Sequence, residues 1–550
     1  MPPGTGGGSA GAEGGVVEAG TEAGAADGGT TCGPVEICGD GEDNDCAGGA
    51  DDGCGGRGTF VSALTGDDRN PGTTAAPLRT IAAGVQAALS LGRGAGVYVA
   101  EGSYAEKVTL TSGVSLFGGF GCTASACVWD RDPSVHVTEI RNVDHEGVLA
   151  PSSVGRDTAI EGFAIVGLAG PSQTAPGVVA LTVLGGAHTI TRNSILGGAS
   201  TSATWPTGRS VGIAVLSAPS SKTEGPRITA NEIAGGNGKG TSIGILFDAR
   251  PGTSCVTDGV VEQNVISGGF ADSAIGVAAF TSDVDVKVVG NVIAAGSAAT
   301  GSAWGVLVSG GLLLDSNVVN AVGTRTCSAA LMWCGGVSTQ SATAILTNNV
   351  ILGTESTLSA GVSLEEIERA AGTVVLHSNL IDGASSGAAL SASTAIRLRI
   401  GACTSCGFVG KVGRIRNNVL SGGKGAARTA VTEDPSAGRR IHPEALENNL
   451  ISIAARGVAD ALYRLDDGAA KTTVQDLPTL NGLAGLGGPF ASSTFAGNLE
   501  GDPMFDADLH LLPGSPCIDK GTATEAPAWD RDGEARPRGA GFDIGPDESP

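Results

Sequence analysis

The residues best suited to bind a ligand lie close together near the start of the chain, between Cys38 and Cys54. Six acidic side chains and one asparagine fall within this run, and glycines interrupt it. Calcium takes about six to eight oxygen ligands, and carboxylates at alternate positions supply them with little strain. The run therefore predicts a calcium site. Its ligands would be Asp40, Asp43, Asn44, Asp45, Asp51 and Asp52.

The same run resembles the metal-binding motif of the MopE kind, which occurs in secreted proteins of myxobacteria and related bacteria. The match spans about 20 residues. It departs at Ala47, where that motif usually has aspartate, so one expected ligand is missing. The alternative is an acidic spacer that holds no ion and is stapled by disulfides among Cys32, Cys38, Cys46 and Cys54.

The chain has 12 cysteines, and most of them lie in close pairs such as Cys122/Cys127, Cys327/Cys334 and Cys403/Cys406. Even numbers and short spacings favour disulfides and an oxidising compartment. Zinc is the alternative for Cys403 and Cys406, although no second pair or histidine stands at ligand spacing. A net charge of -23 excludes binding to nucleic acid or to an anionic lipid surface.

One asparagine recurs through the middle of the chain at a mean spacing of 32 residues. The residue three before it and the residue two after it are Ile, Leu or Val in all nine copies. We expect these aliphatic side chains to point inward from two short strands. The chain would bend at the asparagine, which tolerates left-handed backbone. Coils stacked about 4.8 Å apart would join the amides in a ladder. The nine are Asn193, Asn231, Asn264, Asn291, Asn317, Asn349, Asn379, Asn418 and Asn449.

A glycine followed by an aliphatic residue predicts a third strand in each coil. Copies stand at Gly212-Ile213, Gly244-Ile245, Gly276-Val277, Gly305-Val306, Gly336-Val337, Gly361-Val362 and Gly457-Val458. The pattern predicts an all-β fold, a single-stranded right-handed parallel β-helix with three short strands per coil. Over about residues 130 to 495 it resembles the repeats of the pectin-lyase-like superfold, which indicates fold more than function.

The ends of the solenoid need caps, because open ends expose unpaired strands. Ile81, Val85, Ala88 and Leu89 share one helical face behind Thr80, a predicted N-cap, and indicate a short capping helix. We divide the chain into a Gly/Ala-rich tether (1–31), the Cys/Asp-rich motif (32–56), the N-terminal cap and first coils (57–130), the repeats (131–495) and a C-terminal cap (496–550). Asp530-x-Asp532-Gly533 fits a cation site, but a turn explains it better.

Catalysis on this fold requires charged residues on the outer face of a sheet, and the resemblance directs attention there. The outward positions expected for the third strands hold no charged side chain. They are Ala214, Leu246, Ala278, Leu307, Ser338, Ser363 and Ala389. The column two residues before each asparagine contains Glu262 and Asp315, two coils or about 10 Å apart. That spacing is at the edge of the range for an inverting glycosidase. An ordinary polar strand face is the alternative explanation.

We therefore expect a secreted or cell-surface protein that serves as a non-catalytic scaffold or adhesion protein and contacts polysaccharide. The alternative is a polysaccharide lyase or glycoside hydrolase of the same superfold. Five tryptophans and three tyrosines offer little surface for sugar stacking. No run of residues has transmembrane length. Met1-Pro2-Pro3-Gly4 lacks a basic and an apolar region, so we expect the export segment outside this sequence.

Overall fold

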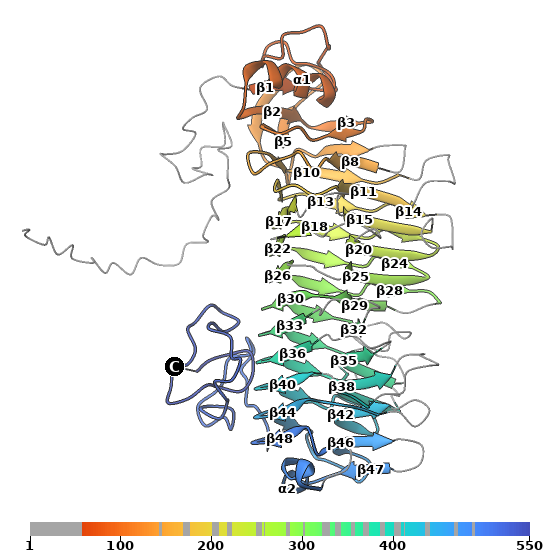
Figure 1. Ribbon diagram of the computed structural model, residues 1–550. Helices are drawn as coiled ribbons and strands as arrows, with labels where there is room; N and C mark the ends of the chain where they lie inside the picture. The colour runs from red at the N-terminus through yellow and green to blue at the C-terminus, as the bar shows by residue number, and fades with distance from the viewer. Residues whose placement is uncertain are drawn as a thin grey trace, which may run out of the picture.

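The computed structural model describes residues 58–549 apart from gaps at 142–145, 169–176, 201–207, 217–222, 249–255, 258, 282–285, 301–302, 322–330, 336–342, 354–357, 367–372, 385–390, 401–408, 412, 435–439, 467–470 and 487–489. The chain winds as a right-handed parallel β-helix, and three long sheets run along its length (Figure 1). This confirms the predicted fold class and the three strands per coil.

The first sheet carries the strands that end just before the asparagines. In spatial order they are β1 (Gly58–Val61), β2 (Ala95–Ala100), β5 (Val114–Cys122), β9 (Ala159–Glu161), β12 (Thr189–Thr191), β17 (Arg227–Thr229), β22 (Val260–Glu262), β26 (Lys287–Val289), β30 (Leu312–Asp315), β33 (Thr343–Thr347), β36 (Thr373–His377), β40 (Arg414–Arg416), β44 (Ala445–Glu447) and β48 (Thr494–Ala496). A further strand, β6 (Cys127–Arg131), pairs antiparallel with β5.

The second sheet begins directly after each asparagine. Its strands are β3 (Gly102–Tyr104), β7 (Thr138–Arg141), β10 (Phe163–Val166), β13 (Ser194–Leu196), β18 (Glu232–Ala234), β23 (Val265–Ser267), β27 (Val292–Ala294), β31 (Val318–Asn320), β34 (Val350–Leu352), β37 (Leu380–Asp382), β41 (Val419–Ser421), β45 (Leu450–Ser452) and β49 (Leu499–Glu500). Most of these strands have only three residues, so the bend at the asparagine joins two short, closely spaced faces.

The third sheet has the longest strands. They are β4 (Val108–Thr109), β8 (Glu146–Ala150), β11 (Val178–Val183), β15 (Arg209–Leu216), β20 (Thr241–Asp248), β25 (Ser273–Thr281), β29 (Ala303–Gly310), β32 (Leu331–Gly335), β35 (Leu358–Glu366), β38 (Ala392–Ile400), β42 (Arg428–Asp434), β46 (Ala461–Asp466) and the antiparallel β47 (Lys471–Val474). Short extra pairings join β14 (Ala199–Ser200), β19 (Asn237–Gly238), β24 (Phe270–Ala271) and β28 (Ser297–Ala298), and also β16 (Thr223–Glu224) with β21 (Val256–Thr257) and β39 (Val409–Lys411) with β43 (Arg440–His442).

The predicted aliphatic columns fill the interior of the prism. Every residue three before or two after the nine asparagines is at most 3 % exposed. Burying one Ile, Leu or Val side chain stabilises a fold by roughly 1.5 to 3 kcal/mol. Because each coil repeats the pair in register, for example Ile195 on Ile233 and Ile233 on Ile266, the core is continuous along the axis.

The asparagine ladder forms as predicted, but the backbone bend lies one residue earlier. Asn317 Nδ2 donates to Asn349 Oδ1 at 3.1 Å, and the same oxygen accepts the Asn317 backbone N–H at 3.0 Å. Positive φ falls on the residue before each asparagine, such as Ser316 at 55°. The prediction of a left-handed asparagine is therefore wrong. The asparagine must point inward to join the ladder, so its predecessor takes the reversed backbone.

Two asparagines outside the predicted nine complete the ladder at its far end. Asn449 Nδ2 donates to Asn498 Oδ1 at 3.0 Å, and Asn498 Nδ2 donates to Asn481 Oδ1 at 2.9 Å. Asn498 escaped the sequence pattern because Glu500, not an aliphatic residue, stands two positions after it. Asn481 ends the short helix α2 (Leu477–Asn481), so this helix terminates the ladder.

In the middle coils of the third sheet, glycine is required where the strands approach the second sheet. A Cβ on Gly212 would lie 2.7 Å from the Gly244 carbonyl oxygen and 2.8 Å from Ile233 Cγ2. Gly276 meets the next coil in the same way. The Gly-aliphatic signal therefore has a steric cause, in addition to the conformational freedom of glycine.

Two of the predicted Gly-aliphatic copies are wrong. Leu331 pairs with Val306, so the strand of that coil is β32 (Leu331–Gly335) and begins before Gly336. In the last coil the strand is β46, and Val458 is 96 % exposed. The register is set by hydrogen bonds to the neighbouring strands. A Gly-aliphatic dipeptide is too common in a chain with 90 glycines to mark that register alone.

A helix closes the N-terminal end as predicted. It is α1 (Ile81–Leu91), and the Thr80 side chain accepts a hydrogen bond from the Ala83 N–H at 3.1 Å, as an N-cap does. Ile81, Val85 and Ala88 are buried against β1 and β2. Leu89, predicted on the same face, is 41 % exposed.

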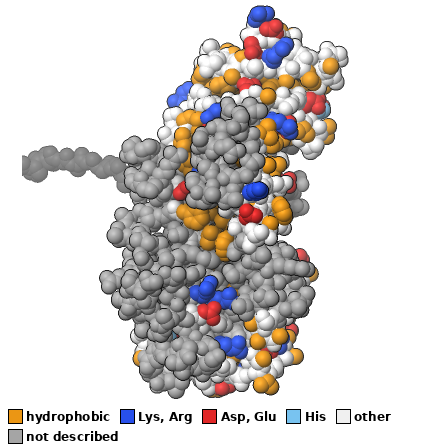
Figure 2. All heavy atoms as spheres, turned by 90° about the vertical axis from the view of Figure 1, so that its right-hand side faces the viewer, with side chains coloured by type: hydrophobic (Ala, Val, Ile, Leu, Met, Phe, Trp, Pro, Cys, Tyr) orange, Lys and Arg blue, Asp and Glu red, His pale blue; other side chains and the backbone are white. Residues whose placement is uncertain are grey.

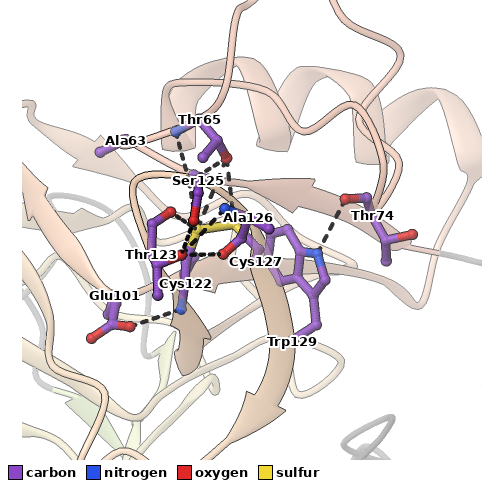
Figure 3. The surroundings of a disulfide bond; sticks show 12 residues. Ala63, Thr65, Thr74, Glu101, Cys122, Thr123, Ser125, Ala126, Cys127 and Trp129 are labelled. Atoms are coloured by element: carbon purple, nitrogen blue, oxygen red, sulfur yellow. Dashed lines mark hydrogen bonds between the residues drawn. A yellow bond between two sulfur atoms is a disulfide. The ribbon is translucent and has the colours of Figure 1, made fainter.

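A disulfide joins Cys122, at the end of β5, to Cys127, at the start of β6, as the sequence predicted (Figure 3). Glu101 holds this hairpin in place, because its Oε1 accepts the Cys122 N–H at 2.7 Å. Trp129 ties the next strand to the loop before α1 by donating its Nε1–H to the Thr74 carbonyl at 3.2 Å.

The C-terminal residues do not all lie over the end of the solenoid. Leu480 of α2 and Leu483 of the 3-10 helix η1 (Leu483–Leu486) are buried at the far end of the core. The segment after β49, residues 501–549, runs back along the side of the prism beside the later coils (Figure 1). Asn417 and Asn448 bind it through its backbone at Thr522 and Lys520. We call residues 501–549 the C-terminal segment.

Candidate functional site

The predicted calcium ligands Asp40, Asp43, Asn44, Asp45, Asp51 and Asp52 lie outside the described residues, and so do Cys32, Cys38, Cys46 and Cys54. The calcium site therefore stays a prediction. The side chains of the Cys327/Cys334 and Cys403/Cys406 pairs also lie outside the described part. Cys517 is a buried free thiol, and burial raises its pKa to about 12.

The column predicted to hold catalytic carboxylates has the expected register. Glu262 pairs with Val289, and Val289 pairs with Asp315, so the two acids stand two coils apart on the first sheet. Glu262 forms an ion pair with Arg227 of the preceding coil. The Glu262 carboxylate is therefore engaged by a neighbouring side chain.

Asp315 is engaged in a different way. Its Oδ1 accepts hydrogen bonds from Thr347 Oγ1 at 2.6 Å and from Asn348 Nδ2 at 2.9 Å. Burial raises the pKa of Asp315 above its usual value. Asn348 also donates to the Trp529 carbonyl at 2.9 Å, so the C-terminal segment lies directly beside this acid.

Later residues of the same column also contact the C-terminal segment. His377 Nε2 lies 3.2 Å from the Thr524 carbonyl oxygen, and burial lowers the pKa of His377 to about 3. Arg416 forms ion pairs with Glu447 and with Glu525 of the segment. From Asp315 onward the column therefore contacts the C-terminal segment, and a catalytic role of Glu262 and Asp315 stays a prediction.

The outer face of the third sheet divides into an apolar and a polar part. In β11, β15, β20 and β25 its outward side chains form a buried apolar cluster. The members are Val179, Val211, Ala214, Leu216, Ile243, Leu246, Ile275 and Ala278. Figure 2 faces this side of the molecule and shows hydrophobic side chains gathered in its middle and charged side chains below them. The prediction that Ala214, Leu246 and Ala278 point outward from the third sheet is thus confirmed.

The polar part contains an arginine that the sequence did not reveal. Arg397 stands between the inward Ile396 and Leu398 and pairs in register with Ser363. It replaces Ala389, the outward residue predicted for this coil. The glycine that marks the strand elsewhere is an alanine here, Ala395, which hid the register.

Arg397 is only 9 % exposed, and its Nε has no hydrogen-bond partner in the described structure. Its nearest counter-ion is Asp434 on the next coil, with Oδ2 at 3.4 Å from Nε and a half-exposed side chain. Burial lowers the pKa of Arg397, and Asp434 opposes this effect. Thr394 and Thr432 flank the guanidinium in the same sheet, and their hydroxyls are 3.2 Å apart. We call these four residues, 394, 397, 432 and 434, the arginine strip.

A buried polar cluster lies behind the arginine strip, inside the prism. Glu433 occupies an inward position between Leu398 and Leu465, where an aliphatic residue would be expected. His442 Nδ1 lies 2.7 Å from Glu433 Oε1, and the Tyr463 hydroxyl donates to the same oxygen. Burial and the adjacent Glu433 raise the pKa of Tyr463. All three side chains are at most 1 % exposed, so they stabilise the interior and do not meet a substrate.

In the Asp530-x-Asp532-Gly533 pattern, the Asp530 carboxylate forms the hydrogen bonds of a turn. Asp530 Oδ1 accepts the backbone N–H of Asp532 at 3.0 Å and of Glu534 at 2.7 Å. Its Oδ2 accepts the N–H of Glu548 at 3.1 Å. Both oxygens of Asp530 therefore shape the chain, as the turn interpretation predicted.

Comparison with known proteins finds similar solved structures but no similar sequence. No protein-family model and no curated protein matches the sequence. The fold is similar to the Azotobacter vinelandii mannuronan C-5 epimerase AlgE4 A-module, with 16% identity, 73% of this chain and 99% of that chain covered, and a TM-score of 0.42. It is also similar to the catalytic unit of a GH87 alpha-1,3-glucanase from Streptomyces thermodiastaticus (13%, 78% and 69%, TM-score 0.43) and to pectate lyase Pel9A (11%, 90% and 96%, TM-score 0.33).

The chain has the architecture of a right-handed parallel β-helix. The three parallel sheets and their in-register coils carry this conclusion. Among the described residues, no helix is long and apolar enough to cross a membrane.

Proposed function

We propose that this protein is a non-catalytic scaffold of the cell exterior that contacts polysaccharide through the arginine strip. The observation that carries the proposal is Arg397, a nine-tenths buried guanidinium whose Nε has no hydrogen-bond partner among the described residues and whose ion-pair partner, the half-exposed Asp434, lies 3.4 Å from that Nε. Such a group favours a planar anion, and the carboxylate of a uronic acid residue fits it. Thr394 is buried and its hydroxyl donates to the Ile396 carbonyl, so the half-buried Thr432 hydroxyl is the one that offers a hydrogen bond to a sugar hydroxyl.

The absence of a catalytic role is argued from the described carboxylates of the first sheet. Glu161 is held by Arg131 and Arg192, and Glu262 by Arg227. Asp315 is held by Thr347 and Asn348. Proton transfer requires an acid or base that a substrate can approach, and these groups are committed to the fold.

Location at the cell exterior is supported by the Cys122–Cys127 disulfide, since such bonds persist in oxidising surroundings. We also propose that residues 38–54 bind calcium. An acidic chain with a net charge of -23 repels a polyuronate at long range. Contact must therefore come from the short-range ion pair with Arg397. Salt screens the long-range repulsion between the acidic chain and the polyuronate more strongly than it screens this short-range pair.

The test is calorimetric titration of the full chain at physiological salt with oligogalacturonate and with a neutral oligoglucan. The Arg397→Gln variant should bind the uronate at least tenfold more weakly, because one charge-assisted pair is worth about 1.5 to 3 kcal/mol. The matched control is Arg156→Gln, an exposed arginine paired with Glu224 far from the strip. Equal uronate binding by wild type and Arg397→Gln would refute the role of the strip.

The second candidate is a polysaccharide-degrading enzyme, favoured by the raised pKa of Asp315, which is suited to a general acid. A screen for chain cleavage over acidic and neutral glycans separates the two. Turnover that is lost in Asp315→Asn would establish the enzyme and overturn the scaffold.

A further inference from the structure

The C-terminal segment brings together three side chains with metal-ligand chemistry. His510 precedes Leu511, which bridges to Phe505, and Asp532 lies in the turn between Trp529 and Ala535. Asp547 comes from the end of the chain. One ligand atom from each of His510, Asp532 and Asp547 lies within 4.8 Å of the other two. Three separate turns thus converge on one point.

Asp547 is the unusual member of the group, because it is 5 % exposed yet incompletely bonded. Its Oδ2 accepts the Leu511 N–H at 2.7 Å. Its Oδ1 has no hydrogen-bond partner among the described residues. This oxygen is therefore free to bind a cation.

The protein's own cations do not fill this position. His510 Nε2 is 3.7 Å from Asp532 Oδ2, which is longer than a hydrogen bond. Arg531 lies 3.6 Å from Asp532 Oδ1, and it is held away by its hydrogen bond to the Asp508 carbonyl at 2.6 Å. A gap between three ligand atoms therefore remains on the solvent side of Asp547.

We propose that His510, Asp532 and Asp547 bind one divalent transition-metal ion, and that zinc fits the set best. One imidazole nitrogen and two carboxylate oxygens suit zinc, whereas calcium prefers oxygen alone. Bonds of about 2.1 Å would place tetrahedral ligands about 3.4 Å apart. His510 and Asp532 side chains are 53% and 37% exposed and can move inward by the small distance required, while Asp547 is fixed.

The ion would join three turns within the C-terminal segment to one another. The segment packs on the second sheet through an apolar cluster in which Leu511 and Ile544 meet Val419 and Leu450. Leu511 follows His510, and Ile544 lies three residues before Asp547. A metal that joins these turns therefore stabilises the face that docks on the solenoid, independently of any glycan contact at Arg397.

The experiment uses the full chain, stripped with chelator and then titrated with zinc chloride. Wild type should bind one zinc more than His510→Ala and Asp532→Asn, and the control Asp508→Asn, an exposed acid in the same segment, should match wild type. Zinc held elsewhere, for example by the N-terminal cysteines, is equal in all variants and cancels. Zinc should also increase amide-exchange protection of residues 501–549 in wild type and Asp508→Asn alone.

The same zinc stoichiometry in wild type, His510→Ala and Asp532→Asn would overturn the proposal. A protection increase that persists in those two variants would overturn it as well. Both variants change exposed side chains and leave the buried Asp547 intact, so loss of folding does not obscure the result.

Discussion

Replacing Asn317 with alanine removes one rung from the middle of the asparagine ladder. The Asn317 amide donates to the carbonyls of Val288 and Asp315, both at 2.8 Å, and to Asn349 Oδ1 at 3.1 Å. Its Oδ1 accepts the backbone N–H and the Nδ2–H of Asn291, both at 2.9 Å. The residue is fully buried. The substitution therefore deletes five contacts without opening the site to bulk water.

The magnitude follows from the groups that lose their partners. The Asn291 N–H is left unsatisfied, which costs about 1 to 3 kcal/mol for a buried donor. The bonds to the Val288 and Asp315 carbonyls are lost as well, at about 1 kcal/mol each. Asn349 Oδ1 keeps the Asn317 backbone N–H, and Asn291 Nδ2 keeps two carbonyls, so neither adds much. The expected loss is about 3 to 5 kcal/mol.

Amide hydrogen exchange is the appropriate assay, because stacked coils interact mainly with their nearest neighbours. Protection should fall in the coils of Asn291, Asn317 and Asn349 and stay near wild type around Asn193. The control is Asn237→Ala, an exposed asparagine whose loss should change stability by less than about 0.5 kcal/mol. Unchanged protection in Asn317→Ala, or an equal loss along the whole solenoid, would refute the ladder as a chain of local couplings.

Three further predictions concern charge. His188 is buried, and burial lowers its pKa from the usual 6.5 to about 4, so the fold favours the neutral ring. Its contribution is present above pH 6.5 and is lost as the pH falls toward 4, a loss of about 3 kcal/mol. Between pH 7 and pH 4, the His188→Leu variant should therefore lose less free energy of unfolding in denaturant melts than wild type does. An identical pH dependence of the two proteins would contradict this. Glu525→Gln removes an acid that pairs with both Arg414 and Arg416 and should speed proteolysis of the C-terminal segment, with a penalty of about 1 kcal/mol; an unchanged cleavage rate would show that these pairs do not hold the segment. Calcium should raise the melting temperature of wild type, and chelator should lower it, but Asp43→Asn/Asp45→Asn should respond to neither; a wild type indifferent to chelator would remove the calcium site.

Part of the candidate site was beyond sequence reasoning for identifiable reasons. The column of Glu262 and Asp315 was placed correctly, because the asparagine repeat fixes the register of the first sheet. The sequence did not show that Asn348 and His377 bind the C-terminal segment, since those contacts join residues more than 140 positions apart. Arg397 was missed because Ala395 stands in its strand where neighbouring coils have glycine, and the local pattern then loses its register.

The amino-acid sequence by itself determined the architecture of this protein. Asparagine with aliphatic residues at two set distances recurs once per coil, and each recurrence specifies one bend and two inward side chains. Those are local rules, so they need no knowledge of the rest of the chain. Tertiary structure alone decided which side chains meet: Glu433 with His442 and Tyr463, and His510 with Asp532 and Asp547. Loop lengths vary between coils and the C-terminal segment folds back, so partners in space are set by long-range packing and not by spacing along the chain.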